Sequence, residues 1–81
     1  MARYFLHLRD GRDETLDEEG SEFADIDAVR AAVLVGARDL IAGDVLQGVI
    51  DFRFRLEAEN EAGEIVYSLP FKQAVRIITE A

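Results

Sequence analysis

Residues 25–48, "DIDAVRAAVLVGARDLIAGDVLQG", carry the signals of one long helix, around which the rest of the fold is arranged. Asp25 is a suitable N-cap, because its carboxylate can accept hydrogen bonds from the unpaired N–H groups of the first turn. Gly48 supplies the left-handed conformation that commonly ends a helix. We therefore predict a helix from about Ile26 to Gln47. Its sheet-facing stripe is spaced by three and four residues and consists of Ile26, Val29, Val33, Ala37 and Leu40.

The opposite side of this helix is also poor in polar residues. A surface helix usually displays charge on the face turned away from its sheet, and one small domain has no second layer to cover that face. We therefore expect a homodimer in which the backs of two helices pack together. The alternative is a monomer with an alanine-rich exposed helix, since exposed alanine costs little. The candidate dimer-interface residues are Ala28, Ala31, Leu34, Val35, Ala42 and Leu46.

The segment before the helix predicts a hairpin. Side chains in residues 3–9 alternate between two faces, which is the two-residue period of a strand. The Asp-Gly pair at 10–11 is typical of a turn, and a short second strand is expected at 14–17 and ends before the Gly-Ser pair at 20–21. One face of the first strand is expected to carry Tyr4, Leu6 and Leu8, and the other Phe5 and His7.

The segment after the helix predicts a second hairpin. Residues 51–59, "DFRFRLEAE", alternate most clearly of all, as in a half-buried antiparallel strand. Residues 60–63 have the length of a hairpin turn, and 64–69 return as the next strand. Pro70 has no N–H to donate and stops the ladder. The apolar spacing at 71–78 predicts a short closing helix.

This element order predicts an α+β fold over residues 1–81 as a single domain. It is a two-layer ββαββ(α) arrangement, with a mostly antiparallel sheet covered on one face by one long helix. The 81 residues include 17 acidic and 9 basic side chains, and the net charge of −8 repels phosphate backbones and anionic lipids. We therefore expect no binding to nucleic acid by this chain alone and none to membranes. The lack of cysteine fits a reducing, cytoplasmic compartment.

His7 and the acids that follow it are the strongest candidates for chemistry. A catalytic histidine needs a nucleophile to activate, and no recognisable nucleophile motif is present, so we expect an exposed or cross-strand-paired histidine on the open face of the sheet. The acidic stretch at 10–19 lacks the ligand spacing of a calcium loop, and we expect a hydrated hairpin tip. Arg53 and Arg55 alternate with phenylalanines, but on opposite faces of a strand, which favours ion pairing with Glu57 and Glu59 over nucleic-acid binding.

The chain resembles a family of short bacterial proteins classed as a domain of unknown function. The resemblance lies in "RYFLHLRDG", "DEEGSEFADIDAVRAA", "ARDLIAGDV" and "LPFKQAVRI", in that order. It implies no activity, cofactor or catalytic residue. Relatives tend to have a solvent-facing Glu or Arg where this chain has "AVLVGA", and that departure favours the dimer. In layout alone, the chain is also similar to HicB-type antitoxins.

We therefore expect a non-enzymatic, acidic interaction or regulatory module that acts as a homodimer, with no catalytic residue, metal ligand or cofactor. An unidentified protein partner is compatible with this role. The alternative is an antitoxin-like inhibitor that masks a basic partner protein, and the third hypothesis is a cation-binding or small-ligand protein.

Overall fold

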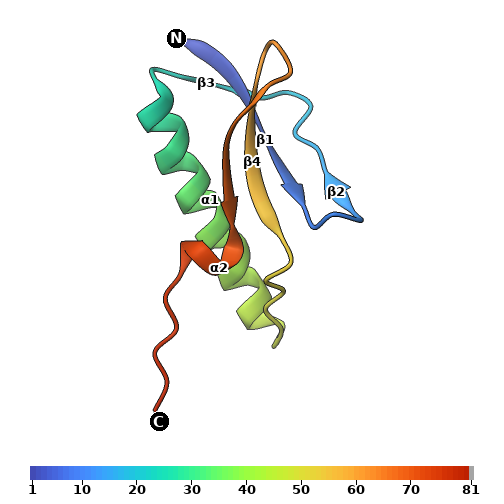
Figure 1. Cartoon of the computed structure of the whole chain (residues 1–81), viewed down its shortest axis with the longest axis vertical. Coiled ribbons are helices and arrows are strands. Elements are labelled where there is room, and N and C mark those ends of the chain that lie inside the picture. The colour runs from blue at the N-terminus through green and yellow to red at the C-terminus, as the bar shows by residue number, and fades with distance from the viewer. Residues whose placement is uncertain (81) are drawn as a thin grey trace.

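An antiparallel sheet and a long helix form the two layers of the computed structural model, which describes residues 1–80 (Figure 1). Within these residues the sheet has five strands in the order β2-β1-β4-β5, and β3 also pairs with β1. The α+β class and the two-layer arrangement predicted from the sequence are confirmed. The elements are β1 (Ala2–Arg9), β2 (Glu14–Thr15), β3 (Ser21–Phe23), α1 (Ile26–Leu46), β4 (Arg55–Asn60), β5 (Ile65–Pro70) and α2 (Phe71–Ala74).

Helix α1 begins and ends where its capping residues indicated. The Asp25 Oδ1 accepts a hydrogen bond from the Ala28 N–H at 2.8 Å, as an N-cap does. The helix ends at Leu46, and Gly48 has a φ of +84°. That positive angle is readily available only to glycine, so the chain can turn back toward the sheet at this point.

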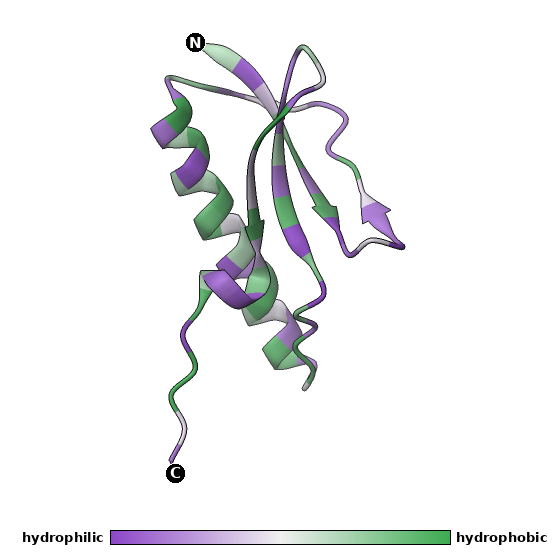
Figure 2. Cartoon of the chain, viewed as in Figure 1, coloured by the Kyte–Doolittle hydropathy of each residue, from purple (hydrophilic) through white to green (hydrophobic). Residues whose placement is uncertain are grey.

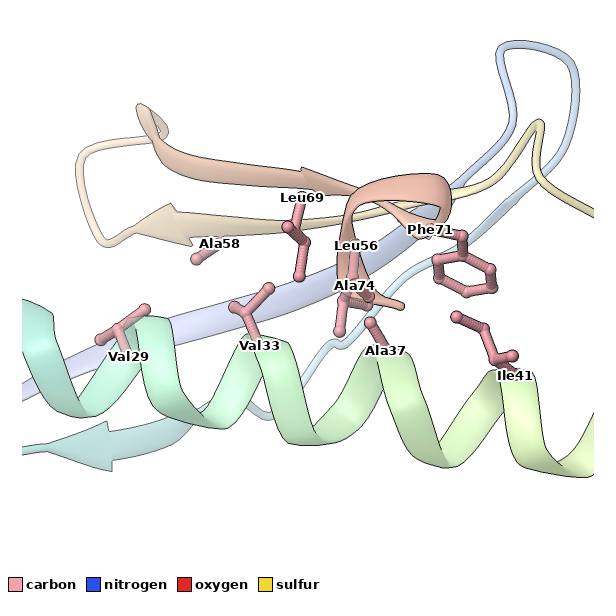
Figure 3. Packing of buried hydrophobic residues seen from close by; sticks show 9 residues of the cluster. All are labelled: Val29, Val33, Ala37, Ile41, Leu56, Ala58, Leu69, Phe71 and Ala74. Carbon is pink, nitrogen blue, oxygen red and sulfur yellow. The ribbon is translucent and has the colours of Figure 1, made fainter. Parts of the chain in front are cut away.

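The core lies between α1 and the sheet, and α2 closes it (Figure 3). Every fourth residue of α1 points inward, and the sheet and α2 supply the opposing side chains. Phe71 is the largest of the fully buried side chains. The cluster consists of Val29, Val33, Ala37, Ile41, Leu56, Ala58, Leu69, Phe71 and Ala74.

The prediction that Leu40 completes the sheet-facing stripe is wrong. Leu40 is 40% exposed, whereas Ile41 is 5% exposed and takes its place. Residues spaced by four form a row that winds slowly around a helix. The twisted strands beneath α1 pack along this row. The inward position therefore moves from Val33 to Ala37 to Ile41, past Leu40.

The N-terminal hairpin contains one strand more than the sequence indicated. β2 covers only Glu14–Thr15, and the predicted break at 20–21 is in fact the start of β3. Gly20 has a φ of +71° and turns the chain back along the same edge of β1. β3 then pairs antiparallel with β1, with Ala2 opposite Phe23.

Two elements after α1 are shorter than predicted. β4 starts at Arg55 because its partner β1 ends at Arg9, which lies opposite Arg55, so residues 51–54 have no neighbouring strand. Figure 2 shows the alternation of polar and apolar residues along β4. Helix α2 ends at Ala74, and Val75 is already extended with φ −135°. The β-branched residues that follow favour extended backbone over helix.

Candidate functional site

His7 lies on the face of the sheet opposite α1, where both of its ring nitrogens have partners. The Nδ1 atom accepts a hydrogen bond from the Asp17 N–H at 3.1 Å, which places the ring proton on Nε2. That Nε2 lies 3.4 Å from the Glu59 Oε2. The predicted pairing across strands is therefore correct, but the expected alternative of an exposed histidine is not, because His7 is only 6% exposed.

Asp17 holds the loop before β3 over this part of the sheet. Its Oδ2 accepts from the Leu6 N–H at 3.1 Å and its Oδ1 from the Gly20 N–H at 3.0 Å. Burial alone would raise the pKa of the Asp17 carboxyl, but these backbone donors outweigh it and hold the pKa below the ordinary value. Asp17 is thus a structural residue. The expectation that the whole acidic stretch at 10–19 is a hydrated tip is wrong at this position.

The turn between β1 and β2 is a hydrated hairpin end, as predicted. The Asp10 Oδ1 accepts from the N–H groups of Arg12 and Asp13 at 2.8 and 2.7 Å, so this carboxylate forms the turn itself. These backbone donors lower the pKa of Asp10. Among residues 1–80, no group of three or more His, Asp or Glu side chains has the arrangement of a metal site.

An ion-pair network follows the same face of the sheet. Glu57 on β4 accepts from the Arg9 Nη1 at 2.9 Å, and its other oxygen lies 3.0 Å from the Arg55 Nε. Arg9 also donates to Glu14 at 2.9 Å. A shallow cleft of about 520 Å³ lies against these side chains and the turn at 11–14. The predicted pairing of Arg55 with Glu57 is confirmed, whereas Arg53 pairs with Asp51 instead.

Three arginines and three acids line this cleft, and two of the arginines are already paired. Each of its two strand arginines is already held by a carboxylate, so an incoming anion would have to displace Glu57 or Glu14. Glu57 is only 9% exposed. Burial alone would raise its pKa, but hydrogen bonds from Arg9 and Arg55 outweigh that effect and lower the pKa of Glu57 below its ordinary value. The network therefore joins β2, β1 and β4 and stabilises the sheet.

Glu57→Gln should destabilise the protein in a pH-dependent way. We expect a loss of about 2 kcal/mol near pH 7, because two partly buried arginines lose their common counter-ion. The stability that Glu57 contributes is fully present above its ordinary pKa of 4.5 and is lost as the pH falls through its lower folded-state pKa. Urea unfolding near pH 7 and near pH 3 should therefore give a smaller difference from the unmodified protein at acid pH. Glu18→Gln, at an exposed position, is the control, and a difference that does not change with pH would contradict the prediction.

The second candidate surface is the back of α1, which faces away from the sheet. Ala31, Ala42 and Leu46 are exposed, and Val35 is 59% exposed. The other two residues predicted for this interface differ. Ala28 is half-buried, and Leu34 packs against the core of its own chain. In Figure 2 α1 carries apolar positions along its whole length. We call the four exposed residues the helix back.

Further exposed apolar residues lie at the C-terminal end of α1 and after α2, outside the predicted interface residues. Val45 is 53% exposed and Val49 65% exposed, at the end of α1 and after it. Ile77 and Ile78 follow α2 and are 62% and 80% exposed. The sequence signal that could have identified exposed apolar residues is a pair of adjacent apolar residues outside any regular pattern, as at 49–50 and 77–78. Such pairs cannot both face the core of one chain when the backbone is extended.

No helix described between Met1 and Glu80 has the length and hydrophobicity that crossing a lipid bilayer requires. No curated protein and no solved structure matches the chain. The model of one family, the domain of unknown function DUF6894, matches residues 3–72. The matched region runs from the second residue of β1 into α2, and so includes all of α1 and all of the sheet except Ala2. The chain therefore belongs to the family described as a domain of unknown function, DUF6894.

Proposed function

We propose that this chain is a non-enzymatic, acidic interaction module that works as a homodimer through the helix back. The observation that carries the proposal is the exposure of Ala31, Val35, Ala42 and Leu46 on one side of a 21-residue helix. A row of exposed apolar side chains on one face of a helix is a candidate protein–protein contact. The lack of cysteine further supports a cytoplasmic role for such a module.

A second copy of the chain fits this surface better than an unrelated partner. Alanines at 31 and 42 leave room for the backbone of another helix to approach closely, and Val35 and Leu46 can fill the space beside small residues of a copy. A two-fold dimer uses the same patch on both subunits, so one row of small and larger residues can form both sides of the interface. The densest block of acids, at 10–27, lies mostly before α1, and Asp39, four residues after Val35, is an exposed acid on this side of the helix.

Val35→Glu should dissociate this dimer and leave the fold intact. Two copies of a buried glutamate would face each other without a counter-ion, so we expect dimer affinity to fall at least about tenfold. In the monomer the change should cost less than about 0.5 kcal/mol, because Val35 is largely exposed. Sedimentation equilibrium gives the association constant and circular dichroism the helix content.

The matched control is Ala62→Glu, which adds the same charge in the exposed turn between β4 and β5. It should leave association unchanged. Because the chain has a net charge of −8, added salt should strengthen association of the unmodified protein by screening repulsion. A mass near that of one 9.1 kDa chain across the micromolar range would overturn the proposal.

The second candidate, an inhibitor that masks a basic protein, is favoured by the acids near β2. Asp13, Glu18 and Glu19 are exposed, and none of their carboxylates is in an ion pair within residues 1–80. Such a surface attracts a cationic partner. Neutralising all three residues should weaken and slow the binding of a basic protein without affecting the dimer, which separates this function from self-association.

A further inference from the structure

The segment after α2 is an extended strip with apolar side chains that face solvent. Residues 75–80, which we call the arm, leave α2 and run away from the sheet along the lower part of the molecule (Figure 1). Val75 packs against the core, so the arm is attached at its first residue. Ile77 and Ile78 are exposed, and the polar residues Arg76 and Thr79 flank them in the chain.

The arm starts beside the helix back. The Nε of Arg38, one helical turn from Val35, donates a hydrogen bond to the Ala74 carbonyl oxygen at 2.8 Å. That carbonyl belongs to the last residue of α2, where the helix leaves its carbonyl groups unpaired. Arg38 therefore fixes the origin of the arm at the edge of the surface that the proposed dimer would bury. An arm that begins there and runs outward is positioned to reach a molecule packed against α1.

The helix back alone is too small for a stable interface. A 21-residue helix is about 31 Å long, and a strip about 10 Å wide along it covers on the order of 300 Å². Stable protein dimers bury about 800 Å² on each partner. Each arm is about 20 Å long when extended, and covers on the order of 200 Å² of the surface on which it lies. Each copy buries its own arm on the partner and is covered by the partner's arm. These two contacts, added to the helix back, bring the buried area on each copy close to the required size.

From these three observations we propose that the arm of each copy lies across α1 of the other copy, with Ile77 and Ile78 covering the partner's apolar side chains next to the helix back. The inference rests on the proposed homodimer and adds the element that completes its interface. Exposed residues at the end of α1, such as Val45, are the apolar surface within reach of an arm from the partner. The arm lies outside the residues that the family model matches, which end at 72.

The first test is the double variant Ile77→Ser with Ile78→Ser, studied in the full chain by sedimentation equilibrium. These residues make no contribution to the core of one chain, so the melting temperature of the monomer should not change. We expect the dissociation constant of the dimer to rise about tenfold or more. The control, Gln73→Ser with Thr79→Ser, changes two exposed polar residues in α2 and the arm and should leave the constant unchanged.

The outcomes separate the two proposals. If the unmodified protein is a monomer, the homodimer and the exchanged arm are both wrong. If the unmodified protein is a dimer and the isoleucine variant associates equally well, the homodimer stands and the arm does not contribute. Equal weakening by the control would also overturn the role of the isoleucines.

A disulfide test shows which copy the arm covers. The chain has no cysteine, so single cysteines can be introduced without competition. Proteins carrying Val45→Cys and Ile78→Cys, distinguished by a mass label and mixed under mild oxidation, should form a disulfide between the two kinds of chain. If the double variant instead forms mainly a disulfide within one chain, the arm covers its own helix and the exchange is wrong.

Discussion

Val33→Glu should unfold the protein under conditions in which Val35→Glu leaves it folded. Val33 is 0% exposed and lies at the centre of the core between α1 and the sheet (Figure 3). A glutamate there would lose the burial of valine and place a charge with no partner in an apolar environment. We expect a cost above about 4 kcal/mol, which is comparable to the whole stability of a domain of this size. Circular dichroism near neutral pH should show the loss of helix.

Val35 provides the internal control for this result, because it lies two residues away on the opposite side of α1. Both substitutions put the same charge in the same helix, so a difference in their effects on folding depends only on which face of α1 carries the charge. Equal and mild effects would mean that the assignment of the two faces of α1 is wrong. Unfolding by both substitutions would show that the helix back is needed for the stability of the single chain.

Gly20→Ala should cost about 3 kcal/mol, the second largest effect that we expect. A Cβ at this position would lie 2.9 Å from the Phe5 ring and 2.9 Å from the Tyr4 carbonyl oxygen. The ring can move, but the backbone of β1 is held by β3 and β4 on its two edges. The substitution adds this contact to the cost of a positive φ for a residue with a side chain. Urea unfolding monitored by circular dichroism measures the loss.

Gly11→Ala separates the cost of a positive φ from the cost of the close contact with β1. Gly11 has a φ of +92°, but nothing lies within 4 Å of its Cβ position, so alanine there has only the backbone cost of about 1 kcal/mol. The excess loss in Gly20→Ala therefore measures the close approach of the loop to β1. Equal losses in the two variants would show that the loop does not press on Phe5 in solution.

The parts of the fold that depend on neighbouring residues in the chain could be predicted from the sequence. The cap at Asp25 and the end at Gly48 are local backbone chemistry. The alternation around Leu56 and Ala58 gave the correct inward face because it needs only the two-residue period of a strand. The α+β class followed from the order of these elements.

The features that the sequence analysis missed depend on contacts between distant segments. β3 exists because Gly20 brings the chain back to an edge of β1, and neither its length nor its composition marks it as a strand. The burial of His7 requires the loop held by Asp17. Ile41 replaces Leu40 because the direction of the sheet under α1 selects one row of the helix.

The candidate site was predictable only in part for the same reason. The helix back follows from helical spacing, so Val35 and Ala42 were identified as exposed without the structure. The arm was not, because residues 71–78 were predicted as a helix and a helix would have turned one of the two isoleucines inward. The ion pair of Glu57 with Arg55 was predicted from their shared face, but its second partner Arg9 lies on a strand whose neighbours the sequence does not reveal.

The position of β1 in the sheet determines the order in which the chain can fold. β1 joins β2 and β3 along one edge, and these partners are close in sequence, whereas its other edge pairs His7 with Glu57, beyond the helix. Closing the long loop that contains α1 costs entropy before the new strand contacts repay it. We therefore expect the helix and the first hairpin to form rapidly and locally, and the docking of β4 onto β1 to be the slow, cooperative step of folding.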